Sequence, residues 1–232
     1  MRSLVIGLAA IAMPLVAISD TADGDVVGEL SMPTLPVWQP SGGETIAFEV
    51  LRKGKPFGTH TVSFDKRDDG KIEVVNDIDL QVKFGPITAY NYSHDSTELW
   101  DDGKLVSLTG QTRKERQDLE VSATAGTDVL NVDGTNYTGT VAADVIPSSH
   151  WHSGEVFADA IFSSEGGQML EIEVEDLGKE MVAVNGQNIE ATRFRLYSDI
   201  TFDLWYDAEG RWVKCAFEAR DQAIEYVLQA LY

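Results

Sequence analysis

The chain has 232 residues, of which 43% are hydrophobic and 24% charged, so it can form a buried core in one domain or two small ones. It has 38 acidic against 18 basic residues, a formal net charge of −20. This excess of negative charge repels phosphate backbones, so nucleic acid is excluded as a predicted partner. The single cysteine, Cys215, cannot form an intramolecular disulfide, and its strand-like surroundings predict a buried, small apolar side chain.

The N-terminal residues predict export. Arg2 precedes an uncharged apolar stretch over residues 4–16, and the small residues Ala17 and Ser19 follow it. This is the pattern of a secretory signal peptide over residues 1–19, cleaved after Ser19, and it indicates a periplasmic or secreted protein. A membrane helix needs about 20 apolar residues, and Asp20 ends the run too early. We therefore predict no membrane span once the signal peptide is removed.

Residues 20–43 read as a flexible leader, and residues 44–232 as a single all-β domain. The leader holds Pro33, Pro36 and Pro40 and has no sustained periodicity. Its aromatic residue, Trp38, has two open interpretations. It either docks the leader on the domain or stays exposed to solvent.

The first half of the domain alternates with the period of two that is typical of strands. Residues 46–50 and 59–66 form a predicted hairpin around the turn residues at 53–58. The next strand is the clearest in the chain, with a face made of Ile72, Val74, Asn76, Ile78, Leu80 and Val82. Its alternation lasts longer than the usual strand of about 5 or 6 residues, which predicts a long, curved antiparallel sheet.

Further strands are predicted over 87–100, 105–113, 119–125, 129–132 and 136–141. One helix follows over 154–162, with Ser153 as its N-cap. The chain then returns to strands over 169–175, 180–184, 189–197, 200–206, 212–219 and 223–231, with turns at Gly178-Lys179 and Asn185-Gly186 among others. The predicted fold class is all-β, a long, curled antiparallel sheet that forms a β-roll or half-open barrel, with one short helix.

Four segments carry a resemblance to a known family. They are GKPFGTH (residues 54–60), IPSSHW (146–151), DLWYDAEGRW (203–212) and IEYVL (224–228). They resemble a family of exported Gram-negative bacterial proteins described only as a domain of unknown function, and the likeness covers most of residues 44–232. The family looks like a distant relative of periplasmic curled β-roll proteins, some of them described as putative lipid or glycolipid binders. The resemblance implies fold and compartment, and it brings no catalytic residue.

The histidines give one alternative interpretation. If their segment is extended, His150 and His152 lie on the same side of it and are candidate metal ligands, with His94 or His60 as a third. Ordinary polar loop histidines fit the same pattern. The primary prediction has no metal, no cofactor and no catalytic residue. The runs Ser148-Ser149-His150 and Ser93-His94-Asp95 do not form triads, because neighbours along a strand face opposite ways.

The aromatic residues suggest a different site. The candidate ligand-binding residues are Trp100, Trp151, Trp205, Tyr206 and Trp212, within a wider aromatic set that includes Tyr90, Tyr92, Tyr197 and Tyr226. If the curled sheet leaves its concave side open, such rings line an apolar cleft for a lipid-like molecule. The competing interpretation is that they fill the core, because aromatic residues are common in strands.

These observations predict an exported, non-catalytic envelope protein that binds a hydrophobic small molecule or lipid in a β-roll cleft. The first alternative is a structural or protein-interaction module whose edge strands pair with an unidentified protein partner. The second is a metal-dependent hydrolase that uses His150 and His152.

Overall fold

A computed structural model describes residues 35–84 and 87–230 of the chain. The predicted signal peptide and most of the predicted leader lie outside the described residues. Among the described residues, no helix is long and apolar enough to cross a membrane.

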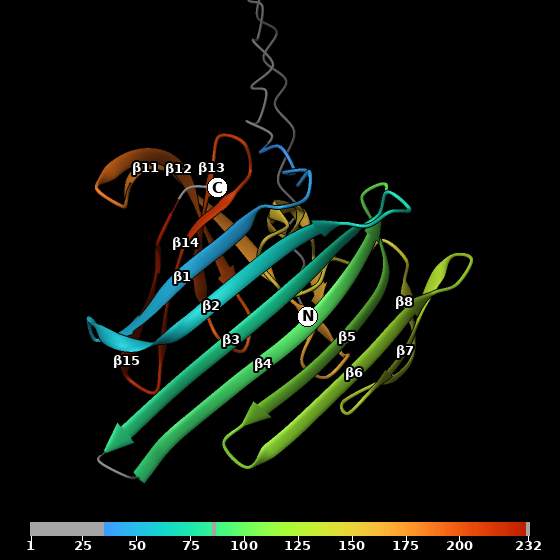
Figure 1. Cartoon of the computed structure of the whole chain (residues 1–232), viewed down its shortest axis with the longest axis horizontal. Helices are drawn as coiled ribbons and strands as arrows, with labels where there is room; N and C mark the ends of the chain where they lie inside the picture. Colours follow the sequence, from blue (N-terminus) through green and yellow to red (C-terminus); the bar gives the residue numbers. More distant parts are fainter. Residues whose placement is uncertain (1–34, 85–86, 231–232) are drawn as a thin grey trace, which may run out of the picture. The chain divides into compact units, whose positions relative to one another are not determined.

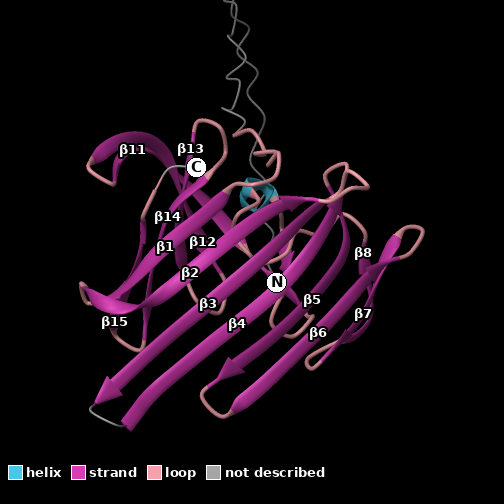
Figure 2. Ribbon diagram, viewed as in Figure 1, coloured by secondary structure: helices cyan, strands magenta, loops and turns pink. Residues whose placement is uncertain are grey.

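The described chain is built almost entirely from antiparallel strands (Figure 2). The first eight strands are β1 (Thr45–Arg52), β2 (Lys55–Lys66), β3 (Ile72–Phe84), β4 (Ile87–Asp101), β5 (Lys104–Lys114), β6 (Gln117–Ala125), β7 (Val129–Gly134) and β8 (Thr138–Ala142). A short 3-10 helix, η1 (Ser153–Phe157), and the hairpin β9 (Ala160–Phe162) and β10 (Met169–Glu171) follow. The last five strands are β11 (Glu173–Val184), β12 (Gln187–Tyr197), β13 (Phe202–Asp207), β14 (Trp212–Ala219) and β15 (Gln222–Leu228).

Thirteen of these strands form one sheet in the order β11-β12-β13-β14-β15-β1-β2-β3-β4-β5-β6-β7-β8 (Figure 1). Each strand pairs with its neighbour in sequence, except that β15 pairs with β1 and so joins the two halves of the chain. β8 and β11 are the two edges and do not pair with each other, so the sheet is not closed into a barrel. The predicted fold class, a long curled antiparallel sheet with one short helix, is confirmed.

The predicted alternation of β3 separates its two faces. Val74 is fully buried, whereas its neighbour Val75 is 37% exposed. The face that holds Val74, Asn76 and Ile78 is the inner face, and it is continuous with the inner face of β4 through the pairs Val74↔Glu98 and Ile78↔His94. The sequence pattern therefore decides which side chains point into the curl.

Residues 143–172, which we call the inner segment, pack against the inner face of the sheet. The Trp151 ring packs edge-on against Phe64 of β2 at 5.2 Å between ring centroids. On the other side, the Tyr206 hydroxyl of β13 donates a hydrogen bond to the His150 carbonyl oxygen at 2.8 Å. Gly110 of β5 allows the closest approach, because a Cβ atom there would lie 2.2 Å from the Ser164 carbonyl oxygen. The inner segment thus contacts both halves of the sheet.

The helix prediction is wrong in extent and in its cap. η1 ends at Phe157, and Phe162 lies instead in β9, where its backbone pairs with Met169. Backbone hydrogen bonds with Ile146 and Ser148 also hold Phe162 in an extended conformation. Tertiary pairing therefore overrides the spacing of apolar residues that favoured a longer helix. The Ser153 side chain is not the cap: its hydroxyl donates to the Pro36 carbonyl oxygen at 2.9 Å.

The turn predicted at Gly178-Lys179 is also wrong. β11 continues through these residues, and its pairing with β12 shifts register between Asp176 and Lys179. Gly178 has a φ of +83°, and its backbone N–H donates to the Asp176 side chain at 2.8 Å. A bulge and a turn both use glycine in this conformation, so the sequence signal is shared by the two.

The described part of the leader, residues 35–43, contacts the sheet. Trp38 packs edge-on against Phe64 at 4.9 Å between ring centroids. The Gly43 backbone N–H donates to the Phe64 carbonyl oxygen at 2.6 Å. Of the two interpretations of Trp38, the structure shows the docked one.

Candidate functional site

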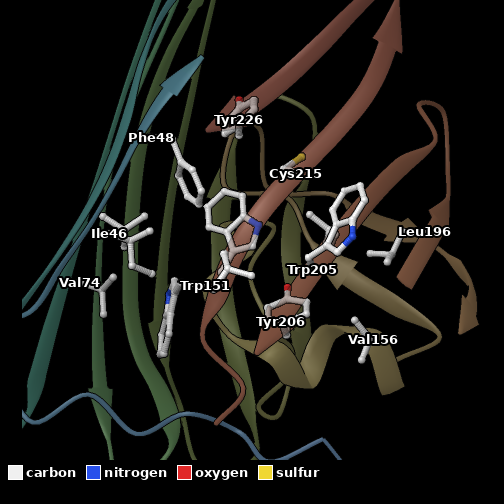
Figure 3. Packing of buried hydrophobic residues seen from close by; sticks show 14 of the residues in the cluster. Ile46, Phe48, Val74, Trp151, Val156, Leu196, Trp205, Tyr206, Cys215 and Tyr226 are labelled. Carbon is white, nitrogen blue, oxygen red and sulfur yellow. The ribbon is translucent and has the colours of Figure 1, made fainter. Parts of the chain in front are cut away.

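A cavity of about 1190 Å³ lies between the inner face of the sheet and the inner segment. Its walls come from inward positions of the predicted strands and from residues of the inner segment. Most of the wall is apolar or aromatic, and prominent members are Ile78, Leu80, Tyr90, Tyr92, Phe217 and Tyr226. Figure 3 shows the packed core from close by, with 14 of its buried side chains drawn as sticks. Tyr226 and Cys215 are among them.

The cavity opens at the end of the sheet where β1 and β5 finish. Arg52 is the last residue of β1 and Lys114 is the last residue of β5, and both line the cavity. The cavity is also lined there by Ser198 and Thr201, which are exposed, as is Lys114. We call this exposed end the mouth.

Three basic residues, Arg52, Lys114 and Arg220, line the mouth together with the exposed acidic residues Asp199 and Glu218. The Arg220 guanidinium lies 5.8 Å from the centroid of the Tyr90 ring and forms an ion pair with Glu115 at 2.6 Å. The Arg52 guanidinium lies 5.7 Å from the centroid of the Phe57 ring. At the mouth, the aromatic wall therefore meets a charged rim that holds both basic and acidic side chains.

The opposite end is closed and carries polar side chains; we call it the floor. His94 and Ser164 line it, and the His94 ring has both nitrogens within hydrogen-bond distance of a hydroxyl. Its Nδ1 lies 2.8 Å from Thr112 Oγ1, and its Nε2 lies 3.3 Å from Ser164 Oγ. Burial lowers the pKa of His94, which favours the neutral ring.

His60 lies on the same floor, in β2, and is 3% exposed. Neither of its ring nitrogens has a hydrogen-bond partner in the part of the chain that the structure describes. The ring packs edge-on against Trp212 at 5.2 Å and Tyr226 at 5.7 Å between centroids. Burial, reinforced by the nearby His150 and His94 and opposed by the Asn76 side chain, lowers the pKa of His60 to about 3, so the ring is neutral at pH 7.

Glu98 lies next to the floor, on the side away from the cavity, where it contacts Asn76, Trp100 and Trp151. Its side chain is fully buried, and its carboxylate accepts hydrogen bonds from the indole N–H groups of Trp100 at 2.8 Å and Trp151 at 3.0 Å. The Asn76 amide donates a third, longer bond of 3.4 Å. Burial raises the pKa of Glu98, and these donors oppose the shift. This cluster separates the cavity from the packed end of the sheet.

The five predicted ligand-binding residues are buried, and none of them lines the cavity. Trp100 and Trp151 donate to Glu98, as described above. The Tyr206 hydroxyl, which has a single proton, lies within hydrogen-bond distance of the Glu155 carboxylate as well as of the His150 carbonyl oxygen. Trp212 packs against Phe48 at 4.5 Å between ring centroids. Their indole and phenol groups have internal partners, which is how buried aromatic side chains are usually accommodated.

Trp205 differs from the other four because its ring lies on the outer face of the sheet. The Arg193 guanidinium lies 5.0 Å and the Lys214 ammonium 4.9 Å from its ring centroid. Its indole N–H donates to Glu180. The adjacent residue, Tyr206, points inward, as the period of two predicts for neighbours in a strand.

The two candidate metal ligands face different partners. His150 Nδ1 lies 3.0 Å from a carboxylate oxygen of the buried Glu155. The His152 ring stacks on Trp100 at 5.1 Å with an interplanar angle of 12°. Within residues 35–84 and 87–230, no group of three or more histidine, cysteine, aspartate or glutamate side chains is placed to hold a metal ion.

Sequence reasoning missed Asn76 as a site residue and singled out His60 only as a third metal ligand. The signal was present in β3, where Asn76 interrupts an inward apolar series between Val74 and Ile78. A polar residue in such a position needs a buried partner. Tyr90, Tyr92 and Tyr226, by contrast, belong to the wider aromatic set that the sequence singled out. Cys215 is a free, buried cysteine, as predicted, and it also contributes to the cavity wall.

The curled sheet and its internal cavity define a β-barrel-like protein with an open edge. The chain belongs to the family described as a domain of unknown function, DUF6134, whose model matches residues 48–229. Among solved structures, it is similar to a β-barrel-like protein of the domain of unknown function DUF1849 from Brucella abortus. That similarity has a TM-score of 0.56 at 9% identity and covers 81% of this chain and 97% of the other, so it shows the fold alone. No curated protein matches the chain.

Proposed function

We propose that the protein binds a hydrophobic, lipid-like molecule in the cavity, with an acyl or other alkyl chain against the aromatic wall. The observation that carries the proposal is the cavity itself, about 1190 Å³ in volume with a largely apolar lining. Small-molecule sites typically occupy about 300–1,000 Å³ and are apolar with a few placed polar groups. The cavity has this composition and the capacity for a large ligand.

The packing of the rest of the interior supports the proposal. Protein cores are close-packed, and voids much larger than a water molecule are few. On β3, the inward residue Val74 is fully buried against the core, whereas Ile78 on the same face is only partly buried and lines the cavity. A packed core and a large apolar void on one strand face are best explained by a second molecule that fills the void.

The proposal includes an extracytoplasmic location, periplasmic or secreted. It rests on the apolar stretch at 4–16 and the small residues before Asp20. In an exporting host, the recovered protein is expected to begin at Asp20. Recovery of an uncleaved chain that starts at Met1 would contradict this part of the proposal.

Ligand binding is tested by titrating the purified protein with N-phenylnaphthylamine, an uncharged probe whose fluorescence rises in apolar surroundings. We expect saturable binding to the wild type. Ile78→Trp places a large ring in the cavity and is expected to weaken binding at least tenfold, because the ring occupies the space of the probe.

Val75→Trp is the matched control, because Val75 lies on the outer face of the same strand. Its binding is expected to equal that of the wild type. The proposal is overturned if the wild type gives no saturable binding, or if Ile78→Trp and Val75→Trp bind the probe equally well.

A further inference from the structure

Two histidines on the cavity floor are in opposite hydrogen-bonding states. His60 and His94 flank Ile78 in the sheet, with the pairs His60↔Ile78 and Ile78↔His94. Both residues are 3% exposed. His94 has hydroxyl partners for both nitrogens, whereas His60 has a partner for neither among the described residues.

Asn76 adds a second unsatisfied group on the same floor. It is 1% exposed, and its Oδ1 atom has no hydrogen-bond partner within the described residues. Its amide nitrogen is already directed to Glu98. A buried polar group without a partner is costly, and nearly all such groups in native proteins are satisfied by protein, water or ligand. The Asn76 side chain interacts with His60 without meeting hydrogen-bond geometry, so the two together offer a ligand the N–H and the bare nitrogen of a neutral His60 and the Asn76 oxygen.

The charges around the floor select against a ligand anion. Glu165 lines the cavity and accepts a hydrogen bond from the Tyr92 hydroxyl at 2.7 Å. Glu98 and Glu155 are fully buried behind the floor, and the basic residues Arg52, Lys114 and Arg220 lie at the mouth. An isolated anion is costly in an apolar interior, and these carboxylates add repulsion. A hydroxyl or carboxamide has both donor and acceptor atoms and no such cost.

We propose that the floor of the cavity recognises an uncharged hydroxyl or carboxamide group at the leading end of the hydrophobic ligand, through the ring nitrogens of His60 and the side-chain oxygen of Asn76. This inference rests on the proposed ligand-binding function. The polar end of the ligand enters first, and its alkyl part lies against the aromatic wall.

The test compares dodecanol with dodecyl methyl ether, which lacks the hydroxyl proton. Each displaces N-phenylnaphthylamine from the wild type and from His60→Phe, which keeps a ring of similar size and removes both nitrogens. We expect His60→Phe to weaken dodecanol binding about tenfold more than ether binding, the scale of one hydrogen bond to a buried group. Leu80→Phe, on the apolar wall, is the control and is expected to change both affinities by the same factor.

The possible outcomes distinguish a failure of the proposed recognition of a polar group from a failure of the proposed ligand binding. If neither the probe nor either ligand binds the wild type, the proposed function itself is wrong. If all three bind but His60→Phe changes dodecanol and ether equally, the cavity binds hydrophobes and the polar recognition is wrong.

A second measurement needs no variant. Nitrogen-15 spectra of the wild-type histidine rings report hydrogen bonding at each nitrogen directly. Dodecanol is expected to shift the His60 nitrogens and to leave those of His94 in place, because His94 is already paired. Unchanged His60 resonances at saturating dodecanol would overturn the inference.

Discussion

The interior of the sheet is tightly packed at one end and holds the cavity at the other, although the same strands form both ends. At the packed end, the Trp151 ring from the inner segment fills the space between Phe64 and Trp100, and Glu98 receives two indole N–H groups. At the cavity end, no described residue fills the space opposite Ile78, and His60 is left without a partner. The inner segment causes this difference in packing, because its side chains fill one end of the curled sheet and leave the cavity at the other end.

The comparison contrasts an end of the interior that stabilises the fold with the end that we propose binds a ligand. Buried polar groups stabilise a fold only when their hydrogen bonds are made, and an unpaired group lowers stability. The packed end meets this condition around Glu98. The floor violates it at His60, as binding sites often do at the expense of stability.

The largest expected effect lies at the packed end. Glu98→Ala removes the acceptor shared by Trp100 and Trp151 and leaves two buried indole N–H groups unpaired beside a new void. We expect the free energy of unfolding to fall by about 3–5 kcal/mol, measured by urea denaturation. A loss below 1 kcal/mol would mean that the cluster does not hold this end together.

The second effect concerns pH at the cavity floor. The pKa of His60 is lowered from 6.5 to about 3 in the folded protein, chiefly by burial. Between these values the unfolded chain binds a proton that the folded protein does not, so stability is lost as the pH falls through this window. His60→Phe lacks this contribution, and its advantage in unfolding free energy over the wild type is expected to grow by about 3 kcal/mol from pH 7 to pH 4.5.

Urea denaturation of both proteins at the two pH values measures this difference. The comparison with the variant cancels the titration of the many carboxylates that the two proteins share. A constant difference between wild type and variant would show that His60 does not titrate in this window.

The smallest effects sharpen the contrast along β3. Val74→Phe and Ile78→Phe enlarge side chains on the same face of one strand, one in the packed core and one at the cavity. We expect Val74→Phe to lower the free energy of unfolding by about 1–3 kcal/mol through overpacking, and Ile78→Phe to change it by less than about 0.5 kcal/mol. Equal losses in thermal or urea denaturation would mean that the two ends are equally packed.

The sheet was predictable because its signal is local. Alternation alone assigns Val74, Ile78 and Leu80 to one face of β3, and the structure confirms that assignment. The length of the same alternation predicted a sheet that curls. The errors at η1 and Gly178 are of a different kind, because pairing partners distant in the sequence decide both.

The candidate site was predictable only in part. Alternation indicates that Trp212 and Tyr226 point inward, but it does not indicate how far the inner segment fills the curl. That depends on contacts such as Trp151 with Phe64, which join segments far apart in the chain. The sequence therefore identified aromatic residues as a class and selected those of the core. His60 becomes conspicuous only when its missing partners are seen.

The most direct test of the account is native mass spectrometry of the protein purified from an exporting host without detergent, followed by organic extraction and lipid analysis. The account predicts a stoichiometric adduct in the mass range of a lipid, and an extracted molecule that carries an alkyl chain and an uncharged hydroxyl or amide group. It also predicts that Ile78→Trp loses the adduct and that Val75→Trp keeps it. A bare mass for the wild type, together with no binding of dodecanol, would contradict the account and favour a structural or protein-interaction role for the open sheet.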